Sequence, residues 1–218
     1  MRFRLRWRER VRRPFWSFVL LGVNVLIFFL SLAFLSLQEG WSLREGICAR
    51  QLKQFCFTPA QALALPWSFL TSAFLHADVA HLFFNMLALF FFGVYLESRI
   101  GSRKFLLLYF STAFVGSLAY WLFDPSATIP ALGASGAIFG ILGALAVLYP
   151  RLMVWIGMPM PVLMAAFLWG IVSFLGMFAP ATGIAHQAHL GGLLLGVAYG
   201  IFLRKTRVRP IYVEAYLR

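Results

Sequence analysis

A chain of 218 residues that is 61% hydrophobic and only 12% charged has too little polar surface to cover itself in water. This composition excludes an ordinary water-soluble domain and predicts a membrane protein. The formal net charge of +12 would suit nucleic acid only if the basic residues shared one surface, so their distribution along the chain decides the interpretation.

Six apolar runs predict an all-α polytopic membrane protein with six transmembrane helices. The first run is too long for the apolar part of a signal peptide and lacks a small-residue cleavage site, so we expect it to be retained. A hydrocarbon core of about 30 Å needs about 20 helical residues, so the fourth and sixth helices are expected to fall short of it. The predicted helices span residues 15–37, 79–96, 105–123, 134–149, 160–177 and 187–203.

The basic residues indicate the orientation of these helices. Of the 19 lysines and arginines, all but Arg44, Arg50 and Lys53 fall on one side of a six-helix chain. Cytoplasmic segments carry such an excess, so both termini are expected in the cytoplasm and the protein in the plasma membrane. The arginine-rich start is expected to touch anionic lipid headgroups. Because the basic residues are explained by their role in orienting the helices, we expect no nucleic-acid partner.

We expect one domain flanked by basic tails: an N-terminal arm at 1–14, the six-helix domain at 15–203 and a C-terminal tail at 204–218. The outer loop at 38–75 is rich in aromatic residues and is expected to lie in the membrane interface. Its cysteines, Cys48 and Cys56, occupy a side where a disulfide is permitted. The sequence leaves open whether they are bonded or remain two free thiols.

The few polar side chains within the predicted helices converge at one depth. Helix two runs inward and carries His81 and Asn85 near its start, on one face. Helix four begins at Ser135, and helix six has His189 in its first turn. Taken singly, such residues usually bond their own backbone or link helices. Polar groups inside a membrane are costly unless paired, so their convergence indicates a functional site.

Ser135 and His189 are predicted to form a nucleophile–base pair, because serine reacts only when a positioned base removes its proton. No orienting carboxylate is apparent, so we expect a dyad in which packing orients His189 and Phe139 stacks on its ring. Small residues at every fourth position would let helices four and six approach closely: Gly136, Gly140, Ala144, Gly192, Gly196 and Gly200.

The anion formed on an attacked carbonyl needs hydrogen-bond donors, and the backbone at a helix start supplies them. We expect donors from the backbone around Gly133, Ala134 and Ser135, with His81 and Asn85 as side-chain donors.

A metal site made of the four histidines is the rival interpretation: His76, His81, His186 and His189. It has no carboxylate partner, and the H-E-x-x-H signature of zinc proteases is missing. We therefore expect neither a metal nor another cofactor.

Four elements together resemble the rhomboid family over the chain from helix one to helix six: GASGAIFG around Ser135, AHLGGLLLG around His189, HADVAHLFFN ending in Asn85, and ESRIG at 97–101. The resemblance implies a rhomboid-like bundle around a short central helix four. It also implies hydrolysis of peptide bonds in or next to transmembrane helices of other proteins, with Ser135 as nucleophile, His189 as general base, and His81 and Asn85 as oxyanion donors.

The resemblance further implies supporting roles away from the reacting atoms. Glu97 and Arg99 would form a structural pair at the inner end of helix two. Trp67 matches a family position in the outer loop, but Ser68 follows it where an arginine is often found. Helix five would act as a gate for substrate.

Two other functions compete with a protease. A catalytically silent rhomboid-like protein that binds membrane clients would be expected to lack the serine or the histidine, and both are present. A transporter or channel would predict inverted repeats or more intramembrane charge, and neither is evident. The sequence therefore predicts a serine endopeptidase whose partners are transmembrane substrates and lipids.

Overall fold

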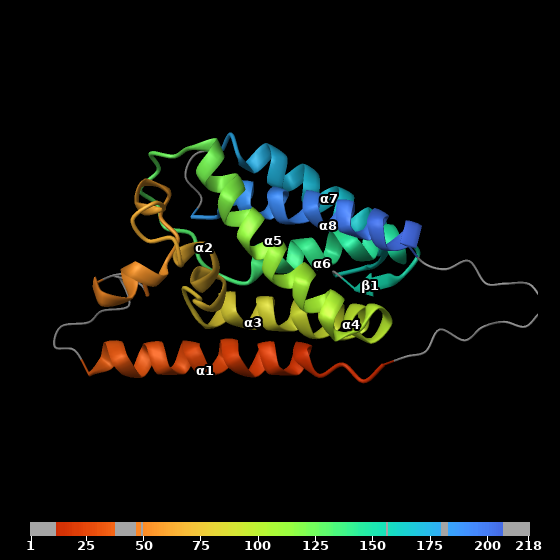
Figure 1. Cartoon of the computed structure of the whole chain (residues 1–218), viewed down its shortest axis with the longest axis horizontal. Helices are drawn as coiled ribbons and strands as arrows, with labels where there is room; N and C mark the ends of the chain where they lie inside the picture. The colour runs from red at the N-terminus through yellow and green to blue at the C-terminus, as the bar shows by residue number, and fades with distance from the viewer. Residues whose placement is uncertain (1–11, 38–46, 49, 156, 180–182, 207–218) are drawn as a thin grey trace, which may run out of the picture.

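The apolar runs form the long helices of a computed structural model, which describes residues 12–37, 47, 48, 50–155, 157–179 and 183–206 (Figure 1). A chain in lipid must satisfy its backbone hydrogen bonds internally, and a helix does so within one segment. The helices of the bundle are α1 (Trp16–Ser36), α3 (Val79–Ala88), α4 (Val94–Ile100), α5 (Ser102–Phe123), α6 (Ser135–Leu148), α7 (Val162–Gly176) and α8 (His186–Thr206).

Three helices of the described chain are long and apolar enough to cross a membrane. They are α1, the continuous run Val79–Ile100 and α5, whereas α6 and α7 are apolar but shorter. A π-helical turn, Leu89–Gly93, joins α3 to α4 within the second span. Helix six was expected to be short, but α8 has 21 residues. That expectation was wrong because the helix continues through Arg204 and Lys205, whose charges suit a helix C-terminus.

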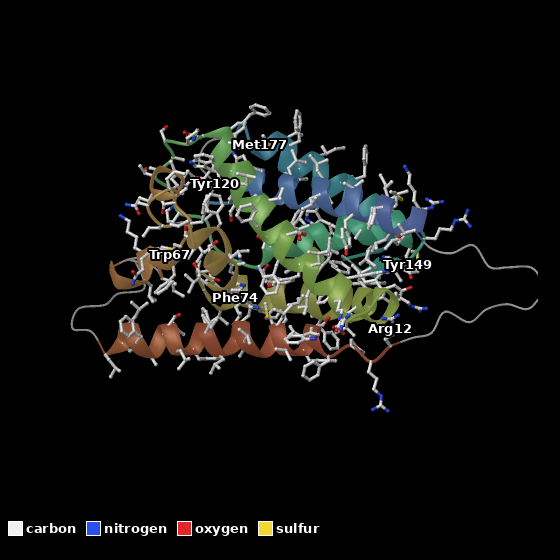
Figure 2. All side chains as sticks on the ribbon, in the orientation of Figure 1. Arg12, Trp67, Phe74, Tyr120, Tyr149 and Met177 are labelled. Atoms are coloured by element: carbon white, nitrogen blue, oxygen red, sulfur yellow. A yellow bond between two sulfur atoms is a disulfide. The ribbon has the colours of Figure 1, made fainter. Side chains whose placement is uncertain are left out.

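The helices pack around α6, which contacts α5, α7 and α8. Most of α6 between Gly136 and Ala146 is buried. Helix α1 lies along one edge of the bundle, beside α3 and α4 (Figure 1). The first and last described residues lie at the same end of the bundle, where Figure 2 also labels Arg12 and Tyr149. Trp67 and Met177 lie toward the opposite end (Figure 2).

Helices α6 and α8 approach closely because glycines line their contact. A methyl group at Gly196 would lie 2.7 Å from the Cα atom of Gly140, and one at Gly192 would meet the carbonyl oxygen of Gly136. Only the absence of side chains at these glycines lets the two helices come so close together. The predicted role of the small-residue stripe is confirmed.

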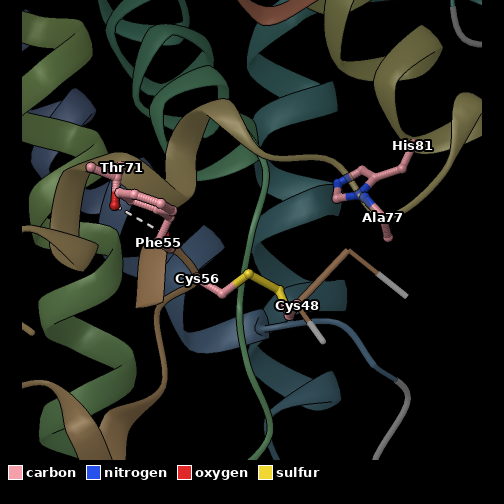
Figure 3. Close-up of a disulfide and its surroundings, with 6 residues drawn as sticks. All are labelled: Cys48, Phe55, Cys56, Thr71, Ala77 and His81. Atoms are coloured by element: carbon pink, nitrogen blue, oxygen red, sulfur yellow. Dashed lines mark hydrogen bonds between the residues drawn. A yellow bond between two sulfur atoms is a disulfide. The ribbon is translucent and has the colours of Figure 1, made fainter. Parts of the chain in front are cut away.

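The segment before α3 folds back on the bundle through short elements: η1 (Arg50–Phe55), η2 (Pro59–Gln61), α2 (Ser68–Thr71) and η3 (Ser72–Phe74). Cys48 and Cys56 form a disulfide (Figure 3), which decides the question that the sequence left open. Trp67 Nε1 donates to the carbonyl of Gln54 at 2.9 Å. Part of the predicted outer loop, and most of the basic arms at 1–14 and 204–218, lie outside the described residues.

A β-hairpin between α6 and α7 was not foreseen in the sequence. Its strands are β1 (Met153–Trp155) and β2 (Pro159–Pro161), which pair antiparallel. Three-residue strands are too short to show alternation above the apolar background of the chain.

Candidate active site

The predicted nucleophile and base are in hydrogen-bond contact. Ser135 is the first residue of α6 and His189 lies in the first turn of α8. The Nε2 atom of His189 is 2.8 Å from the Oγ atom of Ser135. That distance is in the range of a general base bonded to the hydroxyl it deprotonates.

The ring of His189 is oriented by packing. Phe139, one turn after Ser135 on α6, stacks on it with ring centroids 4.3 Å apart and an interplanar angle of 10°. The predicted stacking is therefore confirmed. His186 meets the same imidazole edge-on at 6.1 Å. With one ring parallel and another perpendicular, the imidazole is confined from two sides.

His81 and Asn85 lie beside the start of α6. Asp78 caps α3 by accepting a hydrogen bond from the backbone N–H of His81. The Nδ1 atom of His81 accepts from the backbone N–H of Ala77 at 3.4 Å (Figure 3). A neutral imidazole that accepts at Nδ1 carries its proton on Nε2, so this contact leaves Nε2–H as a donor.

Gly133 is where these side chains meet the backbone before α6. Its φ of +108° is one that glycine adopts readily, and a methyl group there would lie 2.7 Å from the Nε2 atom of His81. Asn85 uses one amide hydrogen to donate to the carbonyl of His81. Its second hydrogen is left for another acceptor near Gly133.

The side chains that the sequence predicted to form the site line one cavity of about 360 Å³. Ser135, His189, His81 and Asn85 all line it, together with Gly133. Ala134 is fully buried and precedes the first turn of α6, whose N–H groups have no acceptor within the helix. Donors, nucleophile and base therefore face a shared space large enough for a short peptide segment and water.

The sequence predicted that Glu97 pairs with Arg99. In the structure, the hydrogen bonds of Glu97 support the fold at a different place. Its buried carboxylate accepts hydrogen bonds from the backbone N–H groups of Phe15, Trp16 and Ser17 at 2.8–3.2 Å. It also accepts from the hydroxyls of Ser17 and Ser102. Glu97 thus caps the start of α1, whereas the guanidinium of Arg99 lies over the rings of Tyr95 and Tyr149.

His76 is a buried neighbour of the site whose position the sequence did not indicate. Its side chain is fully buried, and its ring meets that of His81 at 5.2 Å. Burial, reinforced by the nearby His81, lowers the pKa of His76 to about 3. His76 is therefore neutral near pH 7 and packs against a candidate oxyanion donor.

The four histidines do not gather as the metal interpretation required. His76 pairs with His81, and His186 with His189. Across the described ranges, no group of three histidine, cysteine or carboxylate side chains is placed to share a metal ion.

Comparison with known proteins identifies the family. Residues 64–206 match the family described as the Rhomboid domain. The chain belongs to the rhomboid family. The match includes α3, α6 and α8, and therefore every residue of the candidate dyad and oxyanion site. This rhomboid is a multi-pass membrane protein.

Individual relatives support the same assignment. The chain is 34% identical over 202 residues to Rhomboid protein 1, mitochondrial, of Saccharomyces cerevisiae, a match that covers 87% of this chain and 53% of that protein. It is 34% identical over 190 residues to Rhomboid protease GluP of Bacillus subtilis, covering 84% of this chain and 34% of that protein. The chain thus spans from about a third to about half of the length of these relatives.

A further relative is named as inactive. The chain is 38% identical over 79 residues to Inactive RHOMBOID-like protein 8 of Arabidopsis thaliana, which covers 36% of this chain and 22% of that protein. Family membership alone therefore does not establish activity.

Proposed function

We propose that this rhomboid is an intramembrane serine endopeptidase that hydrolyses peptide bonds in or next to transmembrane helices of other membrane proteins. The observation that carries the proposal is the 2.8 Å contact between Ser135 Oγ and His189 Nε2, inside a cavity that His81 and Asn85 also line. The names of the related proteases support the same chemistry.

The geometry suits acyl transfer through a dyad. His189 Nε2 takes the hydroxyl proton as Ser135 Oγ bonds to the carbonyl carbon of the substrate. The oxyanion then accepts hydrogen bonds from the N–H groups at the start of α6, from His81 Nε2–H and from Asn85 Nδ2–H. His189 passes its proton to the departing amine, and afterwards takes one from the water that hydrolyses the acyl-enzyme.

The proposed topology has six membrane helices, with α6 as the short central one. At about 1.5 Å per residue, the 14 residues of α6 span about 21 Å, well below a core of about 30 Å. Ser135 at its outer end would therefore lie several ångströms below the membrane surface. The cavity above it would supply water at that depth.

The distribution of basic residues supports cytoplasmic termini and a plasma-membrane location. Residues 15–203 would form the protease domain, and 1–14 and 204–218 would form cytoplasmic basic segments. The yeast relative is named mitochondrial, so a fractionation experiment that places the protein in an organelle would reject the location without affecting the chemistry.

Substrate would enter sideways from lipid, past α7. Within the described chain, α7 packs on α6 and α8 but has no substantial packing on α3. Large apolar side chains of both helices, such as Phe84 and Phe167, are exposed. Trp169 packs against the core from α7. An outward movement of α7 would open a path between the two helices to the cavity.

The test is cleavage of a single-span substrate by the purified protein in liposomes. Ser135→Ala and His189→Ala are each expected to lower turnover by at least about 10³-fold. Ser111→Ala is the matched control, because among the described residues the Ser111 hydroxyl bonds only the carbonyl of Leu108 in its own helix. Cleavage that survives Ser135→Ala would reject the mechanism. A folded wild type that cleaves none of several substrates would favour the client-binding alternative.

A further inference from the structure

The β1–β2 hairpin has an apolar face that no other described part of the protein covers. Its strands pair Met153 with Pro161 and Trp155 with Pro159. Side chains alternate between the two faces of a strand. Val154 packs against the core, whereas the neighbouring Met153 and Trp155 are 56% and 76% exposed.

The side chains at these outward positions are apolar, which is unfavourable for a surface exposed to water. A hairpin with one face on the core normally carries polar residues on the other. Here the outward residues are methionine and tryptophan, and Met158 near the turn is 59% exposed as well. Tryptophan is enriched where a membrane meets water, because its ring is apolar and its N–H can still find a partner.

The positive charges around the hairpin indicate which molecule contacts its apolar face. Arg151 is exposed two residues before the start of β1, and α8 ends with Arg204 and Lys205 in its last turn. The hairpin lies at the end of the bundle where these segments and the first described residues also lie (Figure 1). Cations bordering an apolar face complement anionic lipid headgroups above acyl chains.

The apolar face of the hairpin also continues into the lipid-facing side of α7. Strand β2 leads directly into this helix, whose first turn exposes Leu163 and Met164. The patch is thus an extension of a surface that already faces acyl chains under the proposed topology.

We propose that the hairpin is a lipid-binding element of the cytoplasmic leaflet. Met153, Trp155 and Met158 insert into the boundary between headgroups and acyl chains, and Arg151 binds an anionic headgroup. This proposal rests on the topology given under the proposed function, but it does not require that the protein be an active protease.

Insertion of the hairpin would fix the inner end of α7. The backbone N–H of Val162 donates to the carbonyl of Leu152 at 2.7 Å, and that of Leu163 to the carbonyl of Pro150 at 3.4 Å. These bonds join the start of α7 to the chain that forms the hairpin. A membrane-held inner end would leave the outer end, where Gly176 lies against the ring of His186, as the part of the helix that moves.

Depth measurement by electron paramagnetic resonance tests the proposal in the whole protein. Cys48 and Cys56 are bonded to each other, so a cysteine introduced by Met158→Cys can be spin-labelled selectively. Reference labels are placed by Ser126→Cys in an exposed polar loop and by Val172→Cys on the exposed face of α7. The depth of each label follows from two collision rates. One is with oxygen, which is enriched among acyl chains, and the other is with a water-soluble nickel complex present on both sides of the vesicles.

We expect the label at 158 to be intermediate between the two references and to move deeper when phosphatidylglycerol is added to phosphatidylcholine vesicles. Trp155→Ser should move the same label toward water, and Arg151→Gln should abolish the effect of phosphatidylglycerol. A label as water-accessible as that at 126 would overturn the proposal. Spin–spin broadening that shows the face packed against a second copy would overturn it too. If depth is as expected but no substrate is cleaved, only the catalytic proposal fails.

Discussion

Replacing Gly196 by alanine should push helices α6 and α8 apart. The added methyl group would meet the carbonyl oxygen of Gly140 and would lie 2.7 Å from its Cα atom, whereas ordinary contact begins at 3.4 Å. Both neighbouring atoms belong to backbone and cannot rotate away. The helices would therefore have to separate by at least about 0.7 Å at this level, because the carbonyl oxygen is nearer to the methyl group than the Cα atom is.

That separation is large compared with the tolerance of the dyad. His189 lies two helical turns before Gly196 on α8, and Ser135 begins the facing helix. A shift of 0.7 Å would lengthen their contact from 2.8 Å to the 3.5 Å limit of a hydrogen bond. Misplacement by about 1 Å can cost about 10²-fold in rate, so we expect turnover to fall by about 10- to 100-fold. Overpacking should also destabilise the fold by about 1–3 kcal/mol.

The assay is turnover of a single-span substrate in liposomes, with thermal unfolding in detergent micelles measured in parallel. Gly22→Ala is the matched control, since a methyl group at this exposed helical position meets nothing within 4 Å. Gly200→Ala should be intermediate, because its methyl group would be 3.0 Å from the Cβ atom of Val147. If Gly196→Ala turns over substrate as fast as Gly22→Ala, helix separation does not determine the geometry of the dyad.

Two predictions concern stability. Glu97→Gln keeps the volume of the side chain but replaces one acceptor oxygen by a donor amide that faces the N–H groups of α1. Because hydrogen bonds to charged groups are worth about 1.5–3 kcal/mol each, we expect a loss of about 3 kcal/mol or more in unfolding free energy, and an unchanged denaturant midpoint would contradict the capping role. His76 has a folded pKa of about 3, against about 6.5 when unfolded. The unfolded state thus binds the extra proton below pH 6.5, and the stability contributed by neutral His76 is lost as pH falls from 7 toward 3. At pH 5 this loss is about 2 kcal/mol, and His76→Phe should remove that part of the pH slope in micelle unfolding curves. An identical slope in the variant would show that His76 is not the group that titrates.

Much of the site could be predicted because the membrane limits what polar residues can do. Ser135, His189, His81 and Asn85 were grouped by depth alone, and the structure places all four around one cavity. The stacking of Phe139 on His189 was also predicted correctly. It depends on Phe139 and Ser135 sharing one face of their helix, which periodicity alone determines.

The errors have physical causes. Helix six was predicted too short because hydropathy falls at Arg204, although a helix can continue into the headgroup region. Glu97 was matched with the cation two residues away, but its described hydrogen bonds run to α1 and Ser102. The hairpin was missed because strands as short as Met153–Trp155 are stabilised by their contacts more than by their own propensity.

The sequence by itself determined that this chain enters a membrane, where most of its helices lie and which polar residues line one cavity. These properties follow from local composition, because lipid forces apolar segments to satisfy their backbone as helices. Only the tertiary structure decided the bond between Cys48 and Cys56, the cap that Glu97 provides to α1 and the outward face of the hairpin. Each of these depends on how segments fold back and rotate against one another, which close packing of the whole bundle determines.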